Sequence, residues 1–268
     1  MSSVSQSETD IRYRYACDIA RAAASRAYSF YQQRERLITE QHKDRQDVAS
    51  EAGHNVEQLI KTLIAERFPQ DALCSEADAQ ENADTRFLWV IEPLDGTRCF
   101  INGLHNWCVS LALVTEGEAV AGVVYDPNHR EMFHACRGQG AWVNETRLRV
   151  HPAQHLNEGV LGVGISEQAT TDTFIPFLSA LLQQGGTFIR TGSGALMSAW
   201  AAAGRLIGYY APHMRPRNSL AGIVLMQEAG GISNDYLQSE GLKNGNPLLL
   251  ANEVIYHQLN ALLAQPVS

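Results

Sequence analysis

The residues of this sequence that are best suited to chemistry lie in one short segment, Trp-Val-Ile-Glu-Pro-Leu-Asp-Gly-Thr at positions 89–97. An apolar run leads into Glu92, Pro93 interrupts the run, and Asp95 and Gly96 follow as a turn. Two carboxylates offer the oxygen ligands that Mg²⁺ prefers, and a glycine lets backbone N–H groups approach a phosphate. A plain strand end with an Asp-Gly turn has the same spacing, so spacing alone leaves both interpretations open.

This segment and two others resemble the signatures of the inositol monophosphatase family, whose members are Mg²⁺-dependent phosphomonoesterases. The other two are Cys-Ser-Glu-Ala-Asp at 74–78 and Glu-Ala-Gly-Gly at 228–231, and all three stand in the family's order. Further matches, such as Arg-Gly-Gln-Gly-Ala at 137–141, extend the resemblance over nearly the whole chain. The resemblance implies an α+β protein with the layered αβαβα sugar-phosphatase fold, a homodimer, and a site between the two halves of the chain.

The resemblance also implies a phosphoric monoester hydrolase with a Mg²⁺ site. The metal ligands that it implies are Glu76, Glu92, Asp95, Asn218 and the backbone carbonyl of Leu94. The catalytic residues that it implies are Glu76, Asp95 and Thr97, of which Thr97 orients the attacking water. In such a site the ions bind the phosphate, acidify a bound water and stabilise the leaving oxygen.

Three positions depart from the family's pattern. Glu92 stands where the family has an aspartate, so its carboxylate extends further by one methylene, about 1.5 Å. We expect this shift to distort the octahedral coordination that Mg²⁺ requires. Asn218 also replaces an aspartate, and Arg217 adds a cation beside it. Gly53 stands where the family has the aspartate that positions water together with the threonine. Losing the group that positions water lowers the rate about 10²- to 10⁴-fold. Because of the changes at Glu92 and Asn218, we also expect fewer bound Mg²⁺ ions than in typical members, or none.

Basic side chains near these motifs are candidates for binding a phosphate. The predicted substrate-binding residues are Gly96 and Thr97, through their N–H groups, and Arg98, His213, Arg215 and Arg217. Arginine forks bind phosphate directly, so three of them facing fewer carboxylates would replace a metal-mediated site by an arginine-mediated one. A solvated surface charge explains Arg98 as well, and a structural role explains His213.

Three functions are compatible with these residues. The first is a Mg²⁺-dependent phosphomonoesterase that acts on a small phosphorylated metabolite at a reduced or single-ion centre. The second is a non-hydrolytic relative whose old site binds an anionic ligand or a partner protein. The third is an enzyme that uses arginines and His213 for acid–base work on a non-hydrolytic substrate. Bound Mg²⁺ favours the first, and arginine contacts to an anion favour the others.

Helices and an antiparallel meander must position the segment at 89–97. Hydrophobic periodicity predicts helices at 11–34 and 56–64, a polar loop at 39–50, and strands at 87–91, 108–114, 118–125 and 132–136. Further along the chain it predicts strands at 161–165, 187–190, 206–210 and 248–251, alternating with helices at 172–183, 194–203, 218–229 and 253–264. We therefore divide the chain into two halves of one compact unit, 1–150 with most metal-site residues and 151–268.

The composition of the chain indicates its cellular compartment and excludes some classes of binding partner. The 268 residues are 45% hydrophobic and 19% charged, and 21 Lys and Arg against 29 Asp and Glu give a net charge of −8. Such a charge argues against a nucleic-acid partner. The apolar runs have strand length, so we expect no membrane span. Five cysteines without metal-ligand spacing and an amino terminus without signal-peptide features predict a cytoplasmic protein.

Overall fold

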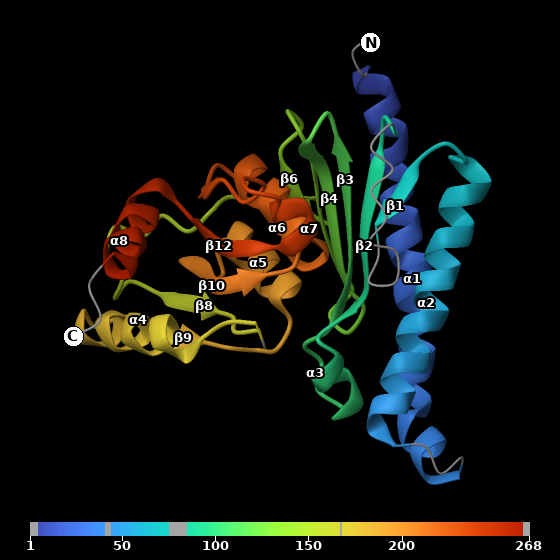
Figure 1. Ribbon diagram of the computed structural model, residues 1–268, viewed down its shortest axis with the longest axis horizontal. Helices are drawn as coiled ribbons and strands as arrows, with labels where there is room; N and C mark the ends of the chain where they lie inside the picture. Colours follow the sequence, from blue (N-terminus) through green and yellow to red (C-terminus); the bar gives the residue numbers. More distant parts are fainter. Residues whose placement is uncertain (1–4, 41–43, 75–84, 167, 265–268) are drawn as a thin grey trace.

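The computed structural model describes residues 5–40, 44–74, 85–166 and 168–264 of the chain. These residues form five layers in the order helix, sheet, helix, sheet, helix (Figure 1). The α+β class and the αβαβα layering that the resemblance implied are thereby confirmed.

The first sheet contains seven strands that lie side by side in chain order: β1 (Ala72–Cys74), β2 (Leu88–Asp95), β3 (Cys108–Thr115), β4 (Glu118–Asp126), β5 (Glu131–Cys136), β6 (Ala141–Val143) and β7 (Thr146–Arg147). β1 and β2 are parallel, and each later pair is antiparallel. The predicted meander is therefore confirmed, and its four predicted strands correspond to β2 through β5.

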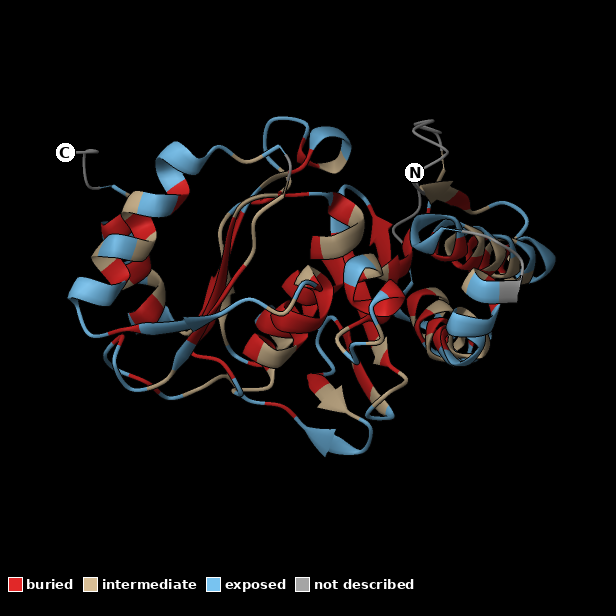
Figure 2. Cartoon of the chain, turned by 90° about the horizontal axis from the view of Figure 1, so that it is seen from below, coloured by how far each residue is buried: buried red, intermediate tan, exposed pale blue. Residues whose placement is uncertain are grey.

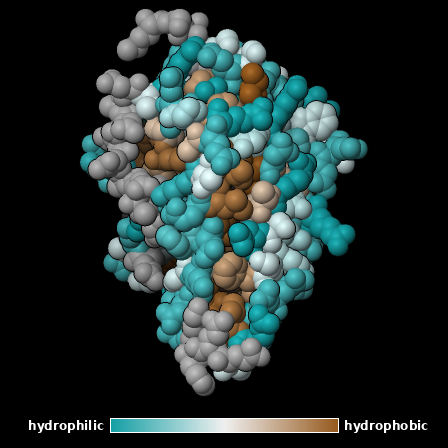
Figure 3. Space-filling model, turned by 90° about the vertical axis from the view of Figure 1, so that its right-hand side faces the viewer, coloured by the Kyte–Doolittle hydropathy of each residue, from teal (hydrophilic) through white to brown (hydrophobic). Residues whose placement is uncertain are grey.

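Two long helices, α1 (Gln6–Glu40) and α2 (Arg45–Arg67), cover the outer face of this sheet. α1 is longer than predicted because no Gly or Pro interrupts residues 6–40. The loop predicted at 39–50 is wrong: the Asp44 carboxylate accepts a hydrogen bond from the backbone N–H of Asp47 at 2.8 Å, which caps α2 at its start. Seen from this side, the surface is largely hydrophilic with a few apolar patches (Figure 3).

The second sheet contains five strands in the order β11 (Ile232–Ser233), β12 (Asn246–Ala251), β10 (Gly208–Met214), β8 (Val160–Val163) and β9 (Thr187–Ile189). Its outer face is covered by α4 (Thr171–Gln183) and α8 (Glu253–Leu263). The strands and helices predicted beyond residue 150 are all present, with ends that differ by a few residues. The division into halves at residue 150 remains a proposal.

Two helices form the central layer, α5 (Gly194–Ala202) and α6 (Pro216–Glu228). They are buried almost all round because both sheets pack against them, which explains why their sequences are apolar without a clear polar face (Figure 2). Two short helices, α3 (Thr97–Ile101) and α7 (Gly241–Asn244), follow β2 and precede β12. No helix in the described part of the chain is long and apolar enough to cross a membrane.

Candidate functional site

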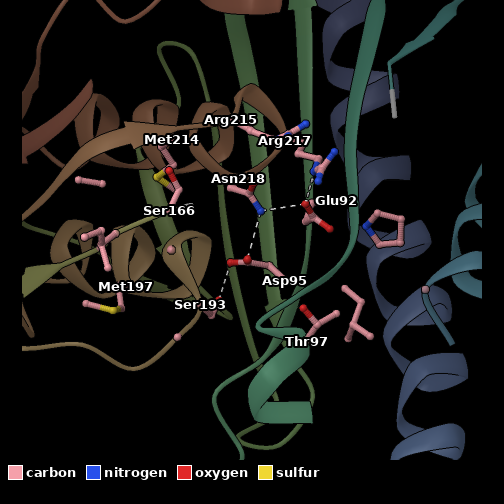
Figure 4. A pocket seen from close by; sticks show the side chains of 18 of the residues that line it. Glu92, Asp95, Thr97, Ser166, Ser193, Met197, Met214, Arg215, Arg217 and Asn218 are labelled. Carbon is pink, nitrogen blue, oxygen red and sulfur yellow. Dashed lines mark hydrogen bonds and ion pairs between the residues drawn. The ribbon is translucent and has the colours of Figure 1, made fainter. Parts of the chain in front are cut away.

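A cavity of about 820 Å³ opens between the two sheets. Its walls are the end of β2, one face of α2, the ends of β8 and β10, the loop before α5 and the first turn of α6 (Figure 4). This volume is typical of sites for small molecules and far exceeds the space that a lone phosphate fills.

Glu92 and Asp95 reach this cavity from the end of β2. In a regular strand, residues three positions apart point to opposite faces of the sheet. Here the pairing of β2 with β3 shifts register between Glu92 and Asp95, and Pro93, which has no N–H to donate, lies within the shift. The irregularity therefore brings both carboxylates to the same cavity.

Arg217 and Asn218 meet these carboxylates from the first turn of α6 (Figure 4). Arg217 Nε lies 2.6 Å from Glu92 Oε2. Asn218 Nδ2 donates to Glu92 Oε2 at 2.8 Å and to Asp95 Oδ1 at 3.1 Å. Pro216 is the first residue of α6, a position that proline favours, and so fixes where the helix begins.

Asp95 is also held from the central layer. Its Oδ2 accepts hydrogen bonds from Ser193 Oγ at 2.6 Å and from the backbone N–H of Ala195 at 2.8 Å. Ser193 is the N-cap of α5, where its Oγ accepts a hydrogen bond from the N–H of Leu196. Burial raises the pKa of the Asp95 carboxyl, and these hydrogen bonds oppose that rise. The Asp95 side chain thus joins β2 to the starts of α5 and α6.

These contacts test whether the residues present suit Mg²⁺. The ion needs several oxygen ligands whose lone pairs face it, but Glu92 and Asp95 accept N–H and O–H donors from Arg217, Asn218 and Ser193. Among the residues that the structure describes, no group of three or more His, Cys, Asp or Glu side chains is arranged to hold a metal ion. The described residues therefore do not fit the multi-ion site that the resemblance implies. Glu76, predicted as part of that site, lies outside the described residues.

Comparison with known proteins agrees with the layers and the motifs. The model of the Inositol monophosphatase family matches residues 10–268. The chain belongs to the inositol monophosphatase family. It is 36% identical over 214 residues to the Nus factor SuhB of Escherichia coli (strain K12), which covers 76% of this chain and 80% of the relative.

Solved structures of this family have the same fold. The inositol monophosphatase from Anabaena (Nostoc) sp. PCC 7120 matches with a TM-score of 0.82 at 27% identity, over 97% of this chain and 98% of that one. The extragenic suppressor protein SuhB from Bartonella henselae matches with a TM-score of 0.79 at 27% identity, over 92% and 97% of the two chains.

The cavity of this inositol monophosphatase family member brings together most of the residues singled out from the sequence. Those that line it are Gly53, Glu92, Leu94, Asp95, Thr97, His213, Arg215, Arg217 and Asn218. Gly96 lies between two of them with a left-handed backbone, φ +88°, and a side chain there would collide with the carbonyl oxygen of Asn106. Arg98 is exposed and is not part of the lining.

His213 is held by both ring nitrogens. Nε2 lies 3.0 Å from the carbonyl oxygen of Asn244, so it carries the proton and donates. Nδ1 lies 3.4 Å from Ser166 Oγ. These two contacts fix the orientation of the ring on the cavity wall.

The lining residues that were not among the predicted site residues include Arg190, Ser193 and Tyr209. The sequence could have predicted the position of Ser193, because Gly-Ser before an Ala-rich helix is typical of an N-cap. Arg190 and Tyr209 had no such signal, because they belong to strands or strand ends whose order in the second sheet does not follow the sequence.

Proposed function

We propose that this inositol monophosphatase family member binds a small phosphorylated metabolite in the cavity through arginine side chains, and that it has lost the family's Mg²⁺-dependent hydrolysis. The observation that carries the proposal is the 2.6 Å contact between Arg217 Nε and Glu92 Oε2. In the site that the resemblance implies, a metal ion neutralises the carboxylate at position 92. In this protein the guanidinium of Arg217 provides that positive charge.

Two arginine side chains of the cavity lining support binding of an anion. Arg190 and Arg215 line the cavity, are exposed, and make no side-chain hydrogen bond or ion pair with any residue that the structure describes. The negative charge of Glu92 is compensated by Arg217. Arginine binds phosphate with two parallel hydrogen bonds, so Arg190 and Arg215 are the groups that we assign to the ligand's phosphate.

The proposed loss of hydrolysis rests on the groups that would activate water. Thr97 lines the cavity, but the helical position opposite, Gly53, has no side chain with which to orient a water. A carboxylate there would have room, because no heavy atom lies within 4 Å of a Cβ built on Gly53. With this group absent, the Glu92 and Asp95 oxygens accept hydrogen bonds from protein donors, and Glu57 forms an ion pair with Lys61 at 2.9 Å. His54, beside Gly53, also lines the cavity, so the proposed loss of hydrolysis requires that its side chain does not replace the missing carboxylate.

Two measurements on the full chain test the proposal. Isothermal titration calorimetry with inositol monophosphate and inorganic phosphate, without divalent metal, is expected to show binding that weakens at least tenfold in an Arg190→Ala, Arg215→Ala double variant. Phosphate release from inositol, sugar and nucleotide monophosphates, with and without Mg²⁺, is expected to stay at the level of an Asp95→Asn control. Mg²⁺-dependent turnover that the control abolishes would overturn the proposal and favour a phosphomonoesterase with Glu76, Glu92, Asp95 and Asn218 around the metal.

A protein partner is the second candidate function. The observation that favours it is the identity of 36% to a protein named as a Nus factor, together with a site that does not fit the family's ions. We propose a protein and not a nucleic acid, because the net charge of −8 repels a phosphodiester backbone. Co-purification of a Nus factor with the tagged chain, retained in an Arg217→Ala variant, would support a partner surface that is separate from the cavity.

We also propose that the chain is a cytoplasmic homodimer. Strand β9 lies at the edge of the second sheet, and its side chains Phe188 and Ile189 are each 40% exposed. Ile175 and Leu182 on α4 are also exposed. Apolar groups on an unpaired edge are candidates for a subunit contact, and a Phe188→Asp variant is expected to sediment as a monomer where the wild type sediments as a dimer.

A further inference from the structure

Tyr209 presents a polar group that the proposed binding of phosphate does not use. It lies on β10, its side chain belongs to the core between the sheets, and only 1% of the residue is exposed. It nevertheless lines the cavity, as do Gly164 and Gly194. The hydroxyl end of the ring lies against both glycines: a Cβ built on Gly194 would come within 3.0 Å of Oη, and one built on Gly164 would collide with it.

No hydrogen bond joins the Tyr209 hydroxyl to a residue within the described ranges. Its oxygen lies against Gly164 and Gly194, which both line the cavity, so it is placed at the cavity wall. A hydroxyl placed in this way loses a hydrogen bond on folding unless something in the cavity supplies an acceptor.

The surroundings of the hydroxyl decide whether it donates or accepts. Burial raises the pKa of Tyr209, and the charge of Asp95 raises it further, against a smaller opposing effect of Arg190. The phenol therefore stays protonated and donates. Since Arg190 and Arg215 are assigned to the phosphate, the acceptor for this donor is sought in the rest of the ligand.

We propose that Tyr209 is a ligand-binding residue whose hydroxyl donates a hydrogen bond to a hydroxyl or carbonyl oxygen in the non-phosphate part of the ligand. The cavity then prefers a phosphorylated ligand that places an oxygen next to the Tyr209 hydroxyl over one that places an alkyl group next to it. This inference rests on the proposed function, since it assumes that the cavity holds a phosphorylated ligand.

The first experiment compares Tyr209→Phe with Tyr210→Phe, which removes the same atom from a neighbouring phenol. Tyr210 packs against Phe177 in the outer core of the second sheet and is not part of the cavity lining. By calorimetry, Tyr209→Phe is expected to bind inositol monophosphate about tenfold more weakly and inorganic phosphate within twofold of wild type. Tyr210→Phe is expected to change neither. Equal weakening for both probes, or no weakening for either, would overturn the proposal.

A second experiment needs no ligand and separates this inference from the proposed function. If the Tyr209 hydroxyl lacks a partner in the free protein, Tyr209→Phe should leave the urea unfolding midpoint unchanged or raise it. Tyr236→Phe is the matched control, because the buried Tyr236 hydroxyl donates to the carbonyl oxygen of Met214 at 2.6 Å and its loss should lower the midpoint. A fall for Tyr209→Phe as large as that of the control would overturn the assignment. Failure of the wild type to bind either probe would overturn arginine-mediated binding and, with it, the role of Tyr209.

Discussion

Arg217 and Glu92 are 125 residues apart in the sequence, yet their side chains form an ion pair with an N–O distance of 2.6 Å. The two side chains are only 17% and 10% exposed, so solvent screens the pair weakly. The pair connects the first turn of α6 in the central layer to β2 in the first sheet. A guanidinium built into the chain thus compensates a carboxylate at the place where relatives are expected to use an ion.

Restoring a carboxylate at position 218 should make the site depend on metal. Asn218→Asp, combined with Arg217→Ala, replaces three N–H contacts by a third negative charge beside Glu92 and Asp95. We expect the free energy of unfolding to fall by about 1–3 kcal/mol in metal-free buffer, because like charges repel and donors are lost. Millimolar Mg²⁺ should recover much of this loss, since an ion that binds only the native state stabilises it.

Urea unfolding with and without Mg²⁺ measures this effect. Asn260→Asp, on the exposed side of α8, adds the same charge away from the cavity and should respond to Mg²⁺ like the wild type. Strong stabilisation of the wild type itself by Mg²⁺ would contradict our interpretation of Arg217.

Gly53 offers a stabilising substitution inside a helix. It lies within α2, and a Cβ added there meets no heavy atom within 4 Å. Gly53→Ala should therefore raise the free energy of unfolding by about 0.5–1 kcal/mol, because alanine loses less backbone entropy on folding. Gly96→Ala should instead lower it by about 1–3 kcal/mol, since φ is +88° and the methyl group collides with Asn106. Denaturant titration of the two variants should give changes of opposite sign.

Asp71 joins the helical layer to the first sheet. Its carboxylate accepts two hydrogen bonds from Arg12 at 2.7 and 2.8 Å and one from Trp89 Nε1 at 2.8 Å, and its side chain is 4% exposed. Asp71→Ala leaves a guanidinium buried without its partner, so the free energy of unfolding should fall by about 3–5 kcal/mol. Asp18→Ala, which breaks an ion pair with side chains 59% and 70% exposed, should change it by less than about 1 kcal/mol. Similar losses in the two variants would contradict the conclusion that the buried contacts of Asp71 stabilise the fold more than the exposed ion pair of Asp18 does.

His134 should make stability depend on pH. Its Nε2 donates to the carbonyl oxygen of Asn144, so its Nδ1 accepts the Tyr13 hydroxyl hydrogen at 2.5 Å. Burial lowers the pKa of His134 from the ordinary 6.5, which means that the unfolded chain takes up the proton first as pH falls. The stability from neutral His134 is therefore present above pH 6.5 and is lost as pH falls through the lower pKa of the folded state.

Unfolding of wild type and His134→Gln at pH 8 and pH 5 checks this dependence. The wild type should lose more free energy of unfolding between the two pH values than the variant, because glutamine does not titrate. Equal losses would mean that His134 has the same pKa in both states.

Much of the fold was predictable because its signals are local. The strands β2 to β5 and the helices α4 and α8 follow from hydrophobic periods of two and 3.6 residues and from turn residues between them. The helices α5 and α6 follow from apolar, helix-forming residues between turn residues. The start of α2 was missed because one capping side chain, Asp44, decides it within a polar stretch that has no hydrophobic period. The short strands β6, β7 and β11 were missed because two or three residues carry no period at all.

The sequence by itself determined the family, the layers and the identity of the altered residues, because motifs and periodicity are properties of neighbouring residues. Only the tertiary structure decided what the alterations do. The register shift in β2 brings Glu92 and Asp95 to one side, and the docking of α6 sets Arg217 and Asn218 against them. Likewise, the hydroxyl of Tyr209 reaches the cavity because Gly164 and Gly194 leave room for it. These contacts join residues from different layers, and no local pattern in the chain specifies which side chains meet there.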